Sequence, residues 1–377
     1  MSRTVELRSD SVTVPLRLRL RKVSVRRSER LVNTRPRIRA RPRASRRAST
    51  GPRRARRRGA PHTGVVPLPP LAADARRRLS LALRDRVAGP DAERRAHAIW
   101  LAPGPRRFAP DDPICRVHGH AGMYAGGIRA LLLQALHPLA MAGVGEHSGY
   151  RGDPWGRLQR TSEFIAMTTY GPLESAQRVI DRINRVHRTV VGTTSDGRRY
   201  AATDSHLLRW VHVAEIDSFL VAHQRYARTP LTPAEADTYV AQTAWAAEQL
   251  GVLDPPRTAG ELDAALTAYR PELETSDGAR DVARFLLAEP PLPWVARPGF
   301  WMLAAGALTM LPGYARDLLD LRLPPTWRAA EPAALALLDP VGRLGTAAVG
   351  WALANPEDPR NAPTSSAVLD RTGRPPA

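Results

Sequence analysis

The sequence predicts an all-α protein, with one helical-bundle domain, at most one short β-hairpin, and a disordered tail at each end. Two observations indicate helices, because apolar residues recur at three- and four-residue steps and helix-capping residues precede several of these segments. A third observation argues against the α/β classes, since strands and helices do not alternate and no internal repeat is visible. We expect tails over residues 1–70 and 351–377 and a folded domain over residues 71–350.

The N-terminal tail carries almost all of the net charge. The chain of 377 residues has a formal net charge of +20, and residues 1–60 supply +18 through 20 arginines, one lysine and three acidic residues. This segment lacks apolar periodicity, so it cannot bury enough surface to fold. A disordered leader is the simpler interpretation, and a polybasic arm for nucleic acid or anionic lipid is the alternative. Because no aromatic residues interleave the arginines, we expect no specific nucleic-acid partner and at most weak contact with a membrane surface.

Cysteine usage and hydropathy argue against several other classes. Cys115 is the only cysteine, which excludes an intramolecular disulfide, a C-x-x-C zinc pair and covalent haem attachment through C-x-x-C-H. The arginine-rich start lacks the apolar h-region of a secretory signal, and the cytoplasm is the expected location. The longest uncharged run, residues 298–315, is interrupted by Gly, Thr and Pro, which favours a buried helix over a membrane span.

The first expected helices lie in the middle of the chain. Residues 126–143 form a long apolar run in which Pro138 forces a bend or a break. Residues 173–191 are amphipathic, because apolar residues recur there at three- and four-residue steps. Gly192 follows this segment and is expected to be its C-cap.

Further elements follow from capping residues and turn residues. A hairpin is expected near residues 193–202, turning at Ser195-Asp196-Gly197. Asp204 is placed to cap a helix over residues 205–223. The run Thr232-Pro233-Ala234-Glu235 has the capping-box spacing for a helix that ends at Gly251. Additional helices are expected over residues 279–288, 300–311 and 333–338.

Histidine is concentrated in one region. Eight of the ten histidines lie between positions 118 and 223, namely His118, His120, His137, His147, His187, His206, His212 and His223. His206 and His223 are interpreted as solvent-facing. Cys115, His118 and His120 form a C-x-x-H-x-H string, but a structural zinc site needs four ligands and no second half is nearby.

Four of these histidines lie on segments expected to be buried. They are His137, His147, His187 and His212. A buried neutral imidazole needs partners for both ring nitrogens, so each one alone fits a hydrogen-bonded core residue. Together with four other polar residues they indicate a polar pocket inside the bundle. Those four are Arg157, Arg160, Tyr200 and Asp204.

Five short motifs, in this order, resemble one known family. They are LLLQALHPLAMAGVGEHS, DPWGRLQRT, HRTVVG, YAATD and LLRWVHV. The resemblance covers residues 114–251 and, more weakly, residues 311–327. Each motif alone is common, but the ordered set is specific. The chain resembles the haem-dependent rubber oxygenases (latex clearing proteins) and the MpaB-type oxygenases.

The resemblance implies a globin-like helical core around a non-covalent haem b. His187, in H-x-x-V-x-G, matches the family's proximal iron ligand, and Arg157 and Thr161 match its R-x-x-x-T motif beside the haem. Arg160 falls where the rubber oxygenases have a distal lysine. Because arginine stays protonated, it cannot bind iron and is expected to donate to dioxygen or to a propionate. The family's base is a glutamate, for which Glu146 is the candidate here.

The leading hypothesis is a haem b-dependent oxygenase that uses dioxygen to attack an apolar, unsaturated substrate of isoprenoid-like or lipid character. Such a site needs an imidazole ligand, an apolar pocket and cations for two propionates. The expected catalytic residues are Arg157, Arg160 and Glu146. The expected haem-pocket residues are His137, His147, Arg157, Thr161, His187, Tyr200, Asp204 and His212.

Three other functions stay open at this point. The first is a haem-binding sensor or carrier without oxygenase turnover. The second is a non-haem iron site of His137, His147 and Glu146, which is disfavoured because sequence neighbours do not share a helix face. The third is nucleic-acid binding through the arginine-rich arm.

Overall fold

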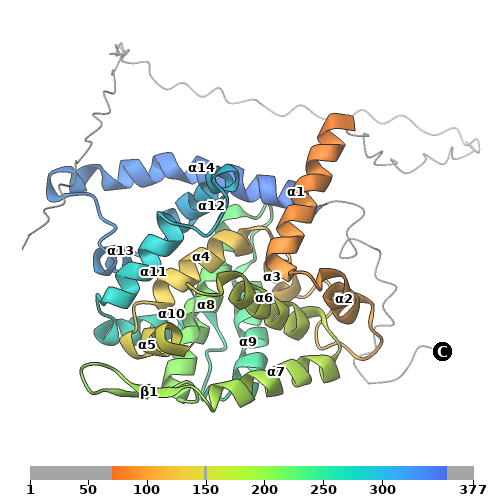
Figure 1. The fold of residues 1–377 in the computed structure, drawn as a ribbon, viewed down its shortest axis with the longest axis horizontal. Helices are drawn as coiled ribbons and strands as arrows, with labels where there is room; N and C mark the ends of the chain where they lie inside the picture. The colour runs from red at the N-terminus through yellow and green to blue at the C-terminus, as the bar shows by residue number, and fades with distance from the viewer. Residues whose placement is uncertain (1–69, 148–150, 355–377) are drawn as a thin grey trace, which may run out of the picture. The chain divides into compact units, whose positions relative to one another are not determined.

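The computed structural model describes residues 70–147 and 151–354, and these contain 14 α-helices and one two-stranded β-hairpin (Figure 1). The predicted all-α class with a single hairpin is confirmed. The globin-like character of the core stays a prediction. The predicted tails lie almost entirely outside the described residues, although the described helices extend a few residues into each of them.

The helices follow one another with short connections. The α-helices are α1 Pro70–Ala88, α2 Ala92–Ala96, α3 Pro113–His118, α4 Gly122–Gln134, α5 Pro138–His147, α6 Pro154–Tyr170, α7 Leu173–His187, α8 Ser205–Tyr226, α9 Pro233–Gln249, α10 Ala259–Tyr269, α11 Asp277–Leu287, α12 Arg297–Met310, α13 Gly313–Leu318 and α14 Glu331–Leu353. A π-helical turn η1 (His97–Leu101) and three 3₁₀ turns, η2 (Arg270–Glu272), η3 (Trp294–Ala296) and η4 (Pro325–Ala330), complete the helical elements.

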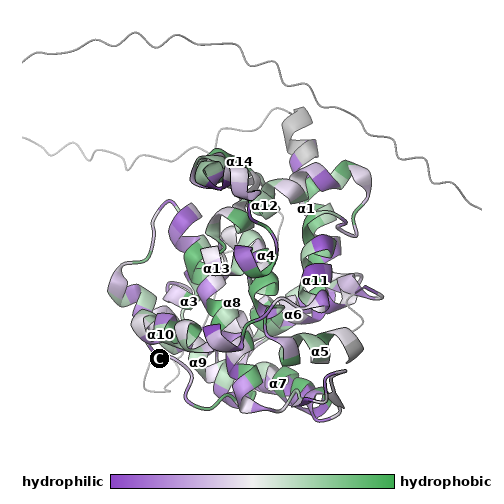
Figure 2. Ribbon diagram, turned by 90° about the vertical axis from the view of Figure 1, so that its left-hand side faces the viewer, coloured by the Kyte–Doolittle hydropathy of each residue, from purple (hydrophilic) through white to green (hydrophobic). Residues whose placement is uncertain are grey.

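Helices α4 and α8 pack against each other at the centre of this unit. Helix α12 lies against α4 and α14, while α9 and α10 lie against α8. In both views α14 lies at one end of the unit and α7 at the other (Figures 1 and 2). The largest hydrophobic cluster contains fully buried residues of the central pair, such as Leu132, Trp210 and Val213.

A buried arginine joins three of these helices. Arg129 of α4 is only 3% exposed. Its guanidinium donates to the Ser218 hydroxyl of α8 at 2.6 Å and to the Met310 carbonyl of α12 at 2.9 Å. Its Nη1 atom also lies 2.7 Å from Asp217 Oδ2, an ion pair that is bent away from hydrogen-bond geometry. A charge this deep in the core requires such partners.

The apolar run 126–143 is broken at Pro138, as expected. Helix α4 ends at Gln134, α5 begins at Pro138, and the axes of the two are bent by 107°. This bent pair is the one combination among the described residues that has the length and composition of a membrane span, and no single described helix has both. The uncharged run 298–315 falls mostly in α12, which buries Leu303 and Ala307 in the core.

Helix α14 corrects the short helix expected over residues 333–338. It extends from Glu331 to Leu353 and contains Pro340 in its interior. A proline inside a helix removes one hydrogen bond and usually ends the helix. Here tertiary packing favours continuation, because α14 crosses α12 at Gly342. A Cβ atom at that position would lie 2.5 Å from the Gly306 Cα.

The segment after α7 corrects the role expected for Gly192. Helix α7 ends at His187 with Arg188 as its C-cap, four residues before the predicted end. Gly192 lies instead in strand β1 (Val191–Thr193), opposite Tyr200 of strand β2 (Arg199–Ala201). A Cβ atom there would lie 2.2 Å from the Tyr200 hydroxyl oxygen, so close approach of this ring explains the glycine. The predicted turn is confirmed, with Gly197 at φ +87°.

Both predicted N-caps are confirmed. The Asp204 carboxylate accepts a hydrogen bond from the His206 backbone N–H at 2.9 Å at the start of α8. Thr232 and Glu235 form the reciprocal capping box of α9. These caps fix where α8 and α9 begin. The helices end at Tyr226 and Gln249, three residues after and two residues before the expected ends.

Candidate functional site

One large cavity dominates the folded unit. It encloses about 2120 Å³ and is lined by mostly apolar residues of α1, α4, α6, α7, α8, α12 and α14. Ordinary ligand pockets enclose ~300–1,000 Å³. The cavity is therefore large enough for a cofactor and an apolar substrate together.

Helix α7 contributes part of the cavity wall. In the N-terminal half of its apolar stripe, Ala176 and Ile180 are buried in close-packed surroundings. In the second half, Ile183, Val186 and His187 line the cavity. Val186 is 55% exposed as a result. The same amphipathic stripe thus serves first as core and then as cavity wall.

His187 lies on this wall without a hydrogen-bond partner among the described residues. Its Nδ1 atom is buried and unpaired. Burial lowers the pKa of His187, which favours the neutral imidazole. A neutral imidazole in an apolar cavity is the form of histidine that binds a metal ion. The surroundings of His187 therefore suit the ligand role implied by the family resemblance.

Helix α6 brings three of the predicted residues to the same cavity. Arg157, Arg160 and Thr161 all line it, and their spacing places them on one side of the helix. Arg157 is half-buried, and its pKa is lowered by burial and, to a smaller extent, by the positive charge of Arg160. Arg160 is exposed at the rim, where its Nη1 lies 3.2 Å from Oδ2 of Asp153, the N-cap of α6.

Helix α8 adds a carboxyl group that the sequence analysis missed. Glu215 lines the cavity on the same stripe as Leu208, Val211 and Phe219. Burial raises the pKa of Glu215 to about 7. Among the described residues it has no hydrogen-bond or ion-pair partner. A glutamate at the i+4 position of an otherwise apolar stripe was the available signal, and its neighbours Ala214 and Ile216 obscured it.

The remaining predicted residues are not gathered in one place. Tyr200 is buried and lines the cavity. His137, Asp204 and His212 do not line it. Asp204 serves as the cap of α8, while His212 has a buried, unpaired Nε2, and burial lowers its pKa to about 4. Glu146 and His147 close α5, and their side chains lie outside the described residues.

The histidines of the C-x-x-H-x-H string make separate contacts. His118 Nδ1 lies 2.8 Å from the Thr169 hydroxyl, and His120 Nδ1 accepts a hydrogen bond from the Gly122 backbone at 3.0 Å. The expectation that His223 faces solvent was wrong. It is 4% exposed, because the end of α8 packs so that its ring lies 5.3 Å from that of His120. His206 is exposed, as expected.

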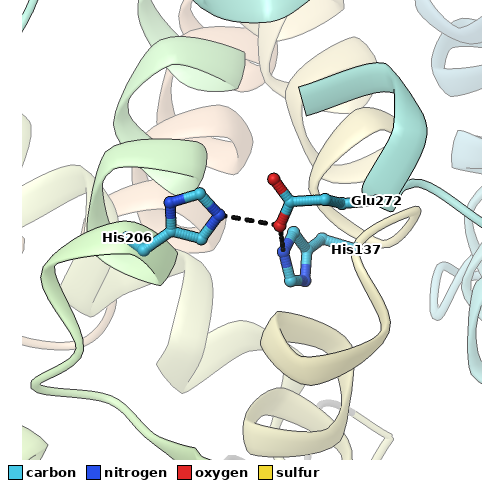
Figure 3. A group of neighbouring side chains, drawn as sticks. All are labelled: His137, His206 and Glu272. Atoms are coloured by element: carbon cyan, nitrogen blue, oxygen red, sulfur yellow. Dashed lines mark hydrogen bonds and ion pairs between the residues drawn. The ribbon is translucent and has the colours of Figure 1, made fainter. Parts of the chain in front are cut away.

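A second group of titratable side chains lies apart from the cavity lining. His137, His206 and Glu272 place their ligand atoms within 4.8 Å of one another (Figure 3). Among the described residues, this is the one such group of three histidine, cysteine or acidic side chains. It differs from the His137, His147 and Glu146 set considered from the sequence, since two of its members come from other elements.

The comparison with known families covers most of the folded region. Residues 115–344 match the family model described as "ER-bound oxygenase mpaB/B'/Rubber oxygenase, catalytic domain". The match extends well beyond residues 114–251, where the motifs are concentrated. Neither a search of curated proteins nor a search of solved structures finds a match. Because the family model covers more than half of the chain, the protein belongs to the mpaB/rubber oxygenase catalytic-domain family.

Proposed function

We propose that this protein is a haem b-dependent oxygenase that uses dioxygen to attack an apolar, unsaturated substrate of isoprenoid-like or lipid character. The observation that carries the proposal is His187, a neutral and unpaired imidazole on the wall of an apolar cavity of about 2120 Å³. Membership of an oxygenase family supports the reaction class.

The described residues fit a non-covalent haem. His187 would be the iron ligand, and its buried Nδ1 would carry the ring proton. Arg157 and Thr161 line the same cavity, and the Arg157 guanidinium suits a propionate. When bound, haem iron supplies the binding and activation of dioxygen.

The chain's own residues supply orientation, exclusion of water and proton handling. Leu208, Val211 and Phe219 give the cavity an apolar wall that favours hydrocarbon over water. Arg160 at the rim is a fixed positive charge and hydrogen-bond donor. Its neighbour Arg157 adds a second, more deeply buried charge.

Glu215 is the proton-handling group that the geometry favours. A carboxyl group with a pKa of about 7 exchanges a proton near neutral pH, which is the property of an effective general acid or base. It projects from the wall of the substrate cavity rather than into solvent. Glu146 stays the candidate suggested by the family resemblance, and Glu215 is a second one.

The test uses the purified full chain reconstituted with haemin. We expect one haem per chain with a Soret band, and dioxygen consumption that depends on an unsaturated apolar probe such as squalene. Glu215→Gln should keep the Soret band but slow turnover by ~100-fold. Glu93→Gln on the exposed face of α2 is the matched control and should not alter turnover.

The results separate this proposal from its alternatives. Haem binding without probe-dependent dioxygen consumption would favour a sensor or carrier. Absence of a Soret band after reconstitution would overturn the proposal altogether.

A further inference from the structure

Three side chains from distant parts of the sequence converge beside the N-terminal end of α8. His137 lies in the turn between α4 and α5, His206 in the first turn of α8, and Glu272 in η2. Figure 3 shows both imidazole rings directed at the same carboxylate oxygen. The His206 Nε2 atom lies 2.7 Å from Glu272 Oε2, and the His137 Nε2 atom lies 3.4 Å from it.

His137 is the unusual member of this group. It is 2% exposed, and both of its ring nitrogens are buried without a hydrogen bond among the described residues. Its contact with Glu272 is close but does not have hydrogen-bond geometry. An unpaired polar atom in the interior is costly, so natural proteins rarely keep one without a purpose. Here the unpaired Nε2 is directed at two further potential ligands.

We propose that His137, His206 and Glu272 form a binding site for a divalent cation of the zinc class. Two imidazoles and one carboxylate are ligands that Zn²⁺ accepts, and three protein ligands leave a fourth position open. With metal–ligand bonds of about 2.0–2.1 Å in a tetrahedron, neighbouring ligand atoms stand roughly 3.3 Å apart. The separation of His137 Nε2 from the carboxylate is already 3.4 Å.

Closing the site requires a small movement of the exposed ligands only. The His206 to Glu272 separation of 2.7 Å has to widen by about 0.6 Å to reach that tetrahedral spacing. The side chains of His206 and Glu272 are 52% and 42% exposed, so both are free to rotate and an ion reaches them from solvent. The buried His137 is the fixed ligand against which they close.

The surroundings orient the histidine and leave room for a cation. The ring of Tyr269 packs on that of His206 at 4.7 Å, and the Tyr269 hydroxyl donates to the His206 carbonyl at 2.8 Å. Arg198 is the nearby positive charge that opposes a cation. Arg198 is already engaged by Asp196 at 2.7 Å and by Glu274 at 2.8 Å.

This site is distinct from the proposed haem cavity, because none of its three ligands lines that cavity. It ties the α4–α5 bend and η2 to the first turn of α8, the helix that carries Glu215. An ion bound only by the folded state stabilises that state, and the effect increases with ion concentration. We therefore assign the site a structural role in fixing the start of α8.

The experiment uses haem-free full-length protein stripped with EDTA. Zn²⁺ is titrated by calorimetry, Co²⁺ is followed by its visible absorption, and Mg²⁺ is the hard-cation control. We expect one Zn²⁺ per chain, a higher Tm with Zn²⁺, tetrahedral Co²⁺ absorption and no response to Mg²⁺. His206→Ala and Glu272→Gln change half-exposed positions that the fold tolerates, and each should weaken Zn²⁺ binding at least tenfold.

The matched control is His97→Ala, which removes an exposed histidine of η1 and should bind Zn²⁺ like the wild type. Zn²⁺ binding of unchanged affinity in both His206→Ala and Glu272→Gln would overturn the proposal, as would the absence of saturable binding by the wild type. The readouts are independent of the Soret band, so failure of this site and failure of the haem proposal are distinguishable.

Discussion

Two carboxylates on α8, only two residues apart, have opposite surroundings. Asp217 faces α4, where Arg129 Nη1 lies 2.7 Å away and holds a buried ion pair. Glu215 faces the cavity and has no charged or hydrogen-bonding partner among the described residues. Two residues correspond to about 200° of rotation around a helix, so the two groups lie on nearly opposite sides.

The difference separates groups that hold the fold together from groups that the fold leaves unsatisfied. A buried charge that serves the fold is matched by an opposite charge and by hydrogen bonds, as Asp217 and Arg129 are. Glu215 has no such match, and its pKa is raised to about 7 instead. Strongly perturbed groups of this kind are concentrated at functional sites. His187, unpaired on the same cavity, belongs with Glu215.

The largest effect is expected on the stabilising side of this comparison. Arg129→Ala leaves the Asp217 carboxylate buried without its counter-charge, which should lower the free energy of unfolding by about 3–5 kcal/mol. Urea denaturation measures this change. Arg178→Ala removes a solvent-exposed pair with Glu174 and should cost less than about 1 kcal/mol. Equal losses in the two variants would show that the buried pair does not stabilise the fold.

The next effect concerns the pH dependence that Glu215 imposes on stability. Its pKa is about 7 in the folded protein, against an ordinary value of 4.5, so the folded state binds this proton more tightly than the unfolded state. The stabilisation is therefore complete below pH 4.5 and is lost as the pH rises through 7. Glu215→Gln removes this dependence. The stability of the variant relative to the wild type should rise by about 3 kcal/mol between pH 4.5 and pH 8.

Urea denaturation of both proteins across this pH range measures the difference, and a difference that is constant with pH contradicts the raised pKa. The comparison with the variant is essential because buried histidines titrate in the opposite sense. Burial lowers the pKa of His118 to about 3 and that of His212 to about 4, so their contribution is present above pH 6.5 and is lost toward acid.

The smallest effect on stability is expected at the rim of the cavity. Arg160 and Asp153 are 60% and 61% exposed, so Arg160→Ala should change the free energy of unfolding by less than about 1 kcal/mol. The same substitution removes a charged donor from the cavity wall, and turnover should fall by roughly a hundredfold. Denaturation and dioxygen consumption together check both parts. A large loss of stability with normal turnover would place Arg160 with the structural pairs.

Local signals in the sequence predicted most of the fold. The caps at Asp204 and Thr232, the break at Pro138 and the hairpin turn at Gly197 are determined by neighbouring residues, and all four are confirmed. The continuation of α14 through Pro340 depends on a crossing with α12 that no local pattern reveals.

The candidate site was predictable only in part, for the same reason. Motif resemblance brought His187, Arg157, Arg160 and Thr161 together, and the structure places all four on one cavity. The assignment of His137 to that cavity relied on its apolar segment, but the 107° bend after α4 directs it toward His206 and Glu272 instead. Which wall a buried polar residue faces is a tertiary property, so Glu215 emerged only from the structure.

The central claim is that His187 holds a haem in this cavity, and the most direct test is the absorption spectrum of reconstituted protein. Wild type, His187→Ala and His212→Ala are each titrated with haemin, and the Soret band and haem affinity are compared. His212 is the matched control because it is a buried histidine that does not line the cavity. We expect His187→Ala to lose tight haem binding and His212→Ala to retain it. A normal Soret band and affinity in His187→Ala, or loss of both in His212→Ala alone, would contradict the assignment.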